Sequence, residues 1–357
     1  MDLDHILTDA VQKDASDVHI TTFLPPIFRI NGSLRRAEDY PQLVSEKIND
    51  LLLTLLDEDK KKMLEKEKEL DFSYSIPKIG RFRVNYFYQR GSLSGAFRII
   101  SSNILTVEDL GLPAQIKEFA SYPRGLVLVT GPTGSGKSTT LAAIIDLINK
   151  TRNENIITIE DPIEYLHSHN KSIVSQREVG MDTNSFARAL KYVLRQDPDI
   201  ILVGEMRDLE TISSALTAAE TGHLVFSTLH TQDAAQTLDR IIDIFPPHQQ
   251  QQVRVQLAGT LKAVLVQQLL PTVDNKGRIP AVELMFSTTA IRNLIREMKS
   301  HQIYSAIQSG GKRGMITMDM SLANLYREGK ITREIAMEKC HNAEDMQRMV
   351  GKSYDPV

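Results

Sequence analysis

Two different spacings of apolar residues divide the chain into two parts. Within residues 1–100, several short segments alternate apolar and polar side chains at every second position, which is typical of strands with one buried face. From residue 116 onward, short apolar runs alternate with helical patterns, which indicates a parallel sheet covered by helices. The pattern therefore predicts an α/β protein with a small domain over residues 1–100, a linker over 101–113 and a larger domain over 114–357.

The small domain is expected to combine a helix with antiparallel strands. Apolar residues recur at helical spacing over residues 3–13, and Asn31 with Gly32 between two apolar runs is a strong hairpin signal. The dense Lys/Glu run over residues 57–69 is most simply a solvated helical face with i,i+4 ion pairs. The expected strands are residues 27–30, 33–35, 72–76, 81–88 and 96–100.

The larger domain is expected to begin with buried strands that alternate with helices and to become mostly helical toward its C-terminal end. Helical patterns over residues 186–195 and 209–221 separate the strands. Beyond Gln249 the pattern turns mostly helical, beginning with residues 253–270, so we expect the C-terminal part, about 271–357, to be helical. The expected buried strands are residues 126–130, 156–159, 200–203 and 224–229.

Residues 125–140, GLVLVTGPTGSGKSTT, read as strand, glycine-rich turn and helix, and contain the phosphate-binding P-loop pattern. Its glycines let backbone N–H groups point at phosphate oxygens, Lys137 reaches the β- and γ-phosphates, and the Ser138 hydroxyl ligates Mg²⁺. The alternative is a flexible Gly/Ser loop that matches by accident. The predicted nucleotide-binding residues are Gly131, Pro132, Thr133, Gly134, Ser135, Gly136, Lys137, Ser138 and Thr139.

Hydrolysis also requires carboxylates near the metal and the attacking water. Two predicted strands end in them, one running into Glu160, Asp161 and Glu164 and the other into Gly204 and Glu205. Carboxyl ends of parallel strands lie at the edge of the sheet where ligands bind. We therefore predict Glu205 as the residue that orients water, Glu160 and Glu164 as supporting acids, and Asp161 with Ser138 as metal ligands. Helix capping is the competing role for these acids.

The second acidic segment resembles a Walker B motif in which Gly204 stands where an aspartate is usual. His230 ends the fourth predicted strand, where it could hydrogen-bond a γ-phosphate, although packing or capping would equally place a histidine there. Arg81 and Arg83 share one strand face with no evident acids nearby, so they are candidates for an arginine finger supplied by a neighbouring subunit. An exposed basic face is the alternative reading of that pair.

Composition narrows the class of protein. A net charge of −3 gives no basic field to attract nucleic acid, and a single cysteine, Cys340, excludes an intrachain disulfide or a cysteine-cluster metal site. The first fourteen residues lack the features of a signal peptide, and no uninterrupted apolar run reaches eighteen residues. We expect a soluble, cytoplasmic protein that does not insert into a membrane.

With these motifs in view, the chain resembles the secretion-superfamily ATPases, and within them the type IV pilus retraction ATPases, from end to end. The likeness is carried by ASDVH, RFRVN, GPTGSGKST, ITIEDPIEY, DPDIILVGEMRDLET, TGHLVFSTLHT and AIRNLIRE. The last segment, residues 290–297, looks like one associated with retraction. On physics alone it is an amphipathic helix with Arg292 and Arg296 facing outward.

The resemblance implies a hexameric ring of Mg²⁺-dependent ATPases that powers pilus retraction and twitching motility. Each subunit would pair a PAS-like N-terminal domain with a RecA-like ATPase domain, with ATP between the two and an arginine finger from an N-terminal domain. The ring would work at the inner face of the inner membrane on a pilus platform protein, and a second pilus ATPase as partner stays open. Gly204 is usual in this family.

Three rival classes remain open at this point. The first is a pilus-assembly or type II secretion ATPase, although such relatives are typically longer and often carry a four-cysteine zinc module. The second is a RecA-like nucleic-acid motor, which the net charge does not favour. The third is a nucleotide sensor that binds partners without hydrolysis, which an intact Glu205 disfavours.

Overall fold

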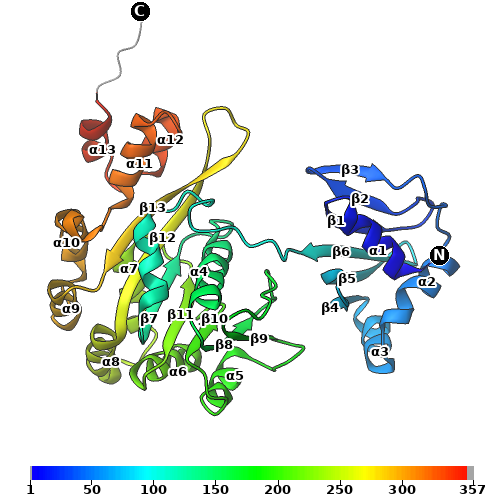
Figure 1. Cartoon of the computed structure of the whole chain (residues 1–357), viewed down its shortest axis with the longest axis horizontal. Helices are drawn as coiled ribbons and strands as arrows, with labels where there is room; N and C mark the ends of the chain where they lie inside the picture. The colour runs from blue at the N-terminus through cyan, green and yellow to red at the C-terminus, as the bar shows by residue number, and fades with distance from the viewer. Residues whose placement is uncertain (1, 352–357) are drawn as a thin grey trace, which may run out of the picture. The chain divides into compact units, whose positions relative to one another are not determined.

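The computed structural model describes residues 2–351 and divides into two units, each with its own core (Figure 1). The smaller unit runs to Asn103 and includes the segment Pro162–Leu166, and the larger unit comprises the rest from Ile104 onward. The last residues of the expected C-terminal part, 352–357, lie outside the described range.

The smaller unit is a six-stranded antiparallel sheet in the order β3-β2-β1-β6-β5-β4. Phe82, Tyr86 and Phe97, which belong to strands of this sheet, are fully buried in the core of the unit. The Tyr86 hydroxyl donates to the carbonyl of Leu52 at 3.1 Å. Its strands are β1 (Ala15–Ile20), β2 (Ile27–Ile30), β3 (Ser33–Arg36), β4 (Glu69–Ile76), β5 (Gly80–Gln89) and β6 (Ser92–Ile100), and its α-helices are α1 (Leu3–Gln12), α2 (Ser45–Leu52) and α3 (Glu58–Glu67).

The strands and helices predicted for this unit are confirmed, with one correction to its ion pairs. In α3, Lys60 pairs with Asp57 and Lys61 pairs with Glu58, so the acid lies three residues before its lysine and not four as expected. Both spacings place side chains on the same helix surface, and exposed pairs of this kind contribute only a few tenths of a kcal/mol.

The larger unit is built on a seven-stranded sheet in the order β13-β12-β7-β11-β10-β8-β9, parallel except for β13. Its strands are β7 (Gly125–Thr130), β8 (Asn155–Glu160), β9 (Ile173–Glu178), β10 (Ile200–Val203), β11 (Leu224–Leu229), β12 (Leu261–Pro271) and β13 (Arg278–Phe286). Its α-helices are α4 (Lys137–Thr151), α5 (Phe186–Val193), α6 (Leu209–Glu220), α7 (Ala234–Asp243), α8 (Pro247–Thr260), α9 (Thr289–Arg296), α10 (Ile303–Ser309), α11 (Met318–Arg327), α12 (Arg333–Lys339) and α13 (Ala343–Val350).

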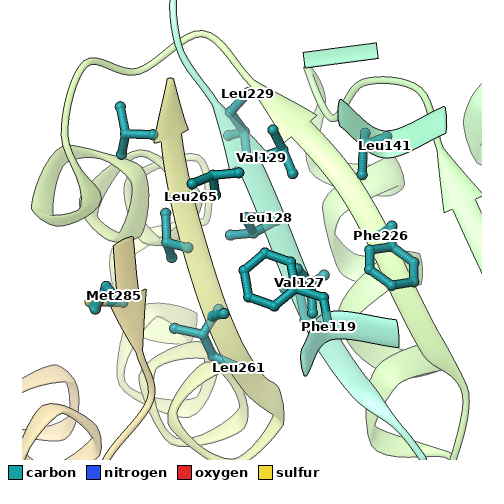
Figure 2. Close-up of a cluster of buried hydrophobic side chains, with 14 of the residues drawn as sticks. Phe119, Val127, Leu128, Val129, Leu141, Phe226, Leu229, Leu261, Leu265 and Met285 are labelled. Carbon is teal, nitrogen blue, oxygen red and sulfur yellow. The ribbon is translucent and has the colours of Figure 1, made fainter. Parts of the chain in front are cut away.

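The core of this unit surrounds the central strands. Figure 2 shows Val127, Leu128 and Val129 of β7 beside Phe226 of β11 and Leu265 of β12. Every residue of β7, β10 and β11 is buried, which explains why these segments read as continuous apolar runs without alternation. The four buried strands predicted from the sequence are therefore confirmed.

The prediction of helix over residues 253–270 is wrong beyond Thr260, because α8 ends there and Leu261–Pro271 forms the longest strand of the sheet, β12. The C-terminal part, expected to be mostly helical over about 271–357, also contains a strand that was not predicted, β13 (Arg278–Phe286). An apolar run that is buried on both faces has no strand periodicity, so the pattern alone could not distinguish it from a buried helix.

The expected linker differs from the division of the structure. Val107 and Leu112, within residues 101–113, are 2% and 7% exposed and belong to the hydrophobic core of the larger unit. Only residues 101–103 of that span group with the smaller unit. The polar start and short length of this segment favoured a linker, although it also contains Ile104, Leu105, Val107, Leu110 and Leu112.

Candidate functional site

The predicted P-loop joins β7 to α4 in the larger unit, as the motif requires. Gly131, Gly134 and Gly136 all have positive φ, at 139°, 77° and 88°. At Gly131 an added Cβ would lie 2.1 Å from the carbonyl oxygen of Gln267, so only glycine fits. The loop therefore turns tightly and places the N-terminus of α4 where it can bind phosphate.

Two side chains of the loop fit a triphosphate. Lys137 is 9% exposed, and its Nζ donates to the carbonyl oxygens of Gly131 and Pro132 at 2.9 and 3.0 Å, so the ammonium is held inside the loop. The Oγ of Ser135 is buried and has no hydrogen-bond partner among the described residues. A buried hydroxyl without a partner is costly unless a ligand satisfies it, and a phosphate oxygen is a suitable acceptor.

Gln267 of β12 holds the P-loop by two hydrogen bonds, and the sequence analysis did not predict a role for this residue. Its side chain is 3% exposed, its Nε2 donates to the carbonyl of Ser135 at 2.8 Å, and its Oε1 accepts from Thr140 Oγ1 at 2.8 Å. It thus connects the loop and the first turn of α4 to the neighbouring strand. Because residues 253–270 read as helix, no pattern in the sequence placed this glutamine beside the P-loop.

A cavity of about 300 Å³ opens next to the loop within the larger unit. Gly136 and Thr139 border it on the loop side, and Leu269 and Arg278 border it on the sheet side. It offers room beside the phosphate cradle for another part of a nucleotide.

Glu205 lies at the same edge of the sheet as the P-loop. It follows β10 by two residues, and His230 follows β11 directly, and β11 lies between β7 and β10 with Leu229 aligned to Thr130. His230 Nε2 is 3.2 Å from Glu205 Oε1, and Arg207 Nη2 donates to Glu205 Oε2 at 2.6 Å. The structure therefore brings together Glu205 and His230 and adds Arg207, which the sequence analysis did not name.

The charge of Glu205 is stabilised in place. Burial acts to raise the pKa of its carboxyl group, but hydrogen bonds and charge from Arg207 and His230 outweigh burial and hold that pKa below its usual range. Its side chain is 18% exposed, so water can reach it. Glu205 is accordingly an ionised acceptor at neutral pH.

Gly204 has a steric reason to replace the usual aspartate. A Cβ at this position would lie 3.2 Å from the carbonyl oxygen of Ile159 and 3.5 Å from the ring of Phe186. The Gly204 N–H also donates to the Ile159 carbonyl at 2.8 Å, which ties β10 to β8. A carboxylate side chain here would have to enter this packed contact.

The remaining acids are arranged differently from Glu205. Glu160 ends β8 and accepts from Thr158 Oγ1 at 2.7 Å and from Gln176 Nε2 at 3.1 Å. Asp161 is exposed, and Glu164 belongs to the segment that groups with the smaller unit. No group of three or more His, Cys, Asp or Glu side chains suited to a metal occurs within residues 2–351. The Ser138 hydroxyl is a hard oxygen ligand of the kind that Mg²⁺ prefers, and the metal roles of Ser138 and Asp161 stay predictions.

Arg81 and Arg83 lie on β5 of the smaller unit, and their finger role stays a prediction. Arg83 is aligned with Arg98 of β6, and Arg98 Nε donates to Asp17 at 2.9 Å. Asp17 therefore compensates the charge of Arg98, the neighbour of Arg83 on this sheet.

A P-loop on a mostly parallel sheet, with a glutamate and a histidine at the same edge, defines the class of P-loop nucleoside triphosphatases. Residues 1–350 match the family described as Type II/IV secretion system protein, and the chain belongs to this family. Within residues 2–351 no helix combines the length and apolarity needed to span a bilayer.

Curated relatives match over most of the chain. The chain is 50% identical to a type IV pilus retraction ATPase, PilT, of Pseudomonas aeruginosa over 95% of this chain and 98% of that protein. It is 48% identical to a twitching motility protein of Neisseria gonorrhoeae over 95% of this chain and 90% of that protein. A crystal structure of the pilus retraction motor PilT with bound ADP has a TM-score of 0.89 at 49% identity, covering 98% of this chain and 99% of that one.

Proposed function

We propose that this protein is an ATP hydrolase that drives type IV pilus retraction. The observation that carries the hydrolase assignment is the P-loop with Glu205 and His230 at one edge of the sheet. The retraction assignment is supported by 50% identity to a pilus retraction ATPase across 98% of its length.

In the proposed reaction the P-loop holds the triphosphate and Glu205 orients the attacking water. Ser135, Lys137 and the N-terminus of α4 bind the phosphates, and Ser138 holds Mg²⁺, which neutralises charge that develops on them. Because the pKa of Glu205 is lowered, the carboxylate is a weak base and acts mainly by accepting a hydrogen bond from water. Arg207 and His230 fix its direction.

The assembly that we propose is a homohexamer in which Arg81 and Arg83 reach the ATP of a neighbouring subunit. Cations delivered across an interface are a recurring device in phosphoryl transfer, because they stabilise charge in the transition state. ATP binding and release would move the ATPase unit relative to the PAS-like unit near residue 103, and the ring would pass that motion to a platform protein at the inner membrane.

The second candidate is a pilus-assembly or secretion ATPase, since the nucleotide chemistry would be the same. The two functions differ in phenotype. Deleting the gene for a retraction motor should leave cells with extra surface pili and no twitching, whereas deleting an assembly motor should leave cells without pili. Counting pili by electron microscopy distinguishes the two outcomes.

Arg292→Ala combined with Arg296→Ala tests retraction separately from hydrolysis. Arg296 is exposed on α9 and, within residues 2–351, bonds only to Asn293 of its own helix at 3.1 Å, so the fold should tolerate its loss. We expect measurable phosphate release but no twitching, and Lys299→Ala just beyond the helix serves as the matched control. A double variant that still retracts pili contradicts the role of this helix and leaves the hydrolase assignment standing.

A further inference from the structure

A cavity of about 420 Å³ lies in the larger unit at the edge of the sheet opposite the P-loop. It opens beside Lys262 near the start of β12 and Phe286 at the end of β13, and α9 begins at its rim. The strand β7 runs from this edge to the P-loop, so its six residues separate the two sites by roughly 20 Å. The cavity is therefore distinct from the nucleotide site.

The cavity is lined by cations and by no carboxylate. Lys262 forms no ion pair within residues 2–351, and neither does Arg292, whose Nε and Nη2 donate to the Ser287 carbonyl at 3.2 and 3.1 Å. Arg313 differs, because it pairs with Glu118 and lies over the Phe286 ring at 4.7 Å. Lys262 and Arg292 thus line the cavity without an ion pair among the described residues, and Lys262 also lines a second cavity that Glu220 borders.

The positive charge of Lys262 is destabilised by burial and by nearby arginines. Burial, together with repulsion from Arg292 and Arg124, holds its pKa below the usual range. An anion bound in the cavity would relieve this repulsion and stabilise the charged lysine. Cation clusters without acids are unfavourable in an isolated chain, and a bound acid removes the penalty.

The polar wall of the cavity also suits an anion. The Ser287 side chain is 9% exposed, and its Oγ is buried without a hydrogen-bond partner among the described residues. Thr288 caps α9 by accepting from the N–H of Ile291, and first-turn N–H groups of a helix favour negative charge. Ser287, two cationic side chains and the start of α9 thus all border one cavity.

We propose that this cavity binds a carboxylate side chain in an acidic segment of a partner protein. Tyr122, Pro123 and Phe286 give it apolar walls, which suit the methylene groups and neighbours of a glutamate better than a bare inorganic ion. The site would dock a partner on the face that carries α9. This inference does not depend on whether the motor extends or retracts pili.

The test measures protection of Lys262 in the full-length protein saturated with ADP, so that the P-loop is occupied. A limiting amine-acylating reagent is applied at pH 7.5, and modification is quantified by mass spectrometry at Lys262 and at the exposed control Lys330. The probes are a capped five-residue peptide with glutamate between leucines, the same peptide with glutamine, and inorganic phosphate. The acylation rate of Lys262 should fall about fivefold when the glutamate peptide reaches about four times its Kd, while Lys330 stays unchanged.

Equal protection by the glutamine peptide, or none by either peptide, overturns the proposal. Protection by phosphate at a lower concentration than the glutamate peptide also overturns it, because the site would then be one for a free anion. Ser287→Ala should weaken binding of the glutamate peptide about threefold or more and leave ATP hydrolysis unchanged. The exposed control Ser309→Ala should change neither peptide binding nor hydrolysis. Unchanged affinity in Ser287→Ala contradicts the role of the buried hydroxyl.

Discussion

At the residue scale, the proposed chemistry depends on one carboxylate, that of Glu205, which has a partner at each of its two oxygens. Arg207 and His230 each contact a different oxygen of Glu205, so the carboxylate keeps its charge and its direction. A group arranged in this way is suited to positioning water and poorly suited to taking a proton from it. Substitutions that change only its charge therefore test its function best.

Glu205→Gln is expected to reduce ATP turnover by about 10²- to 10⁴-fold while leaving nucleotide binding intact, because the amide keeps the shape but loses the charge. Lys137→Ala should remove binding as well as turnover, since the ammonium lies within the phosphate loop. Phosphate release and titration with a fluorescent ADP analogue measure the two properties. Glu210→Gln, an exposed acid on α6, is the control, and a fully active Glu205→Gln would remove the basis for the hydrolase assignment.

Glu283 of β13 gives a second residue-scale prediction, which concerns pH. Its buried carboxyl accepts from the Ala234 N–H at 2.8 Å at the start of α7, and burial raises its pKa from the ordinary 4.5 to about 7. The folded protein therefore binds this proton more tightly than the unfolded chain. Stability from this group is full below pH 4.5 and is lost as pH rises toward 7.

Between pH 4.5 and pH 8, the wild type should lose about 2–3 kcal/mol of unfolding free energy relative to Glu283→Gln, which cannot titrate. Urea unfolding at several pH values, with the exposed Glu338→Gln as control, measures the difference. Parallel pH profiles for wild type and Glu283→Gln would show that the folded and unfolded states hold this proton equally.

At the element scale, the strands and helices predicted correctly were those with a clear local sequence pattern. The P-loop strand and helix, β10 before Glu205, and β11 before His230 were all predicted, because each combines a buried run with a characteristic end. The strand β12 was missed, since α8 passes into it between Thr260 and Leu261 with no break and both its faces are buried. Because the strand was not predicted, its site residue Gln267 was not predicted either.

Gln267→Leu should weaken nucleotide binding about tenfold or more. Leucine fills a similar volume but leaves the Ser135 carbonyl and the Thr140 hydroxyl without partners, and each unsatisfied group costs about 1–3 kcal/mol. The phosphate loop should then lose its bound shape. Titration with the fluorescent ADP analogue measures the affinity, and Gln268→Leu, the next residue on β12 but only half-buried, controls for the general effect of the change. Equal affinity in both variants would mean that Gln267 does not organise the loop.

At the scale of the whole molecule, the residues predicted to act in catalysis are distributed over two units. The P-loop, Glu205 and His230 belong to the larger unit, while Arg81 and Arg83 belong to the smaller one. Both sets were proposed from the sequence because each depends on local spacing along the chain. The sequence could not determine which subunit's arginines serve which P-loop, because that depends on contacts between copies of the chain.

Mixing two inactive variants decides between fingers acting within one subunit and between subunits. One variant carries Arg81→Ala and Arg83→Ala with an intact P-loop, and the other carries Glu205→Gln with intact arginines. If the finger acts across subunits, rings assembled from equal amounts should regain about a quarter of the active interfaces, because a subunit with an intact Glu205 then faces a neighbour with intact arginines. If the arginines act within their own subunit, no mixture recovers phosphate release, since each chain still lacks one essential group. Mixing either variant with Lys137→Ala extends the test: only the Glu205→Gln mixture should stay inactive, because neither of its partners supplies a working ATP site.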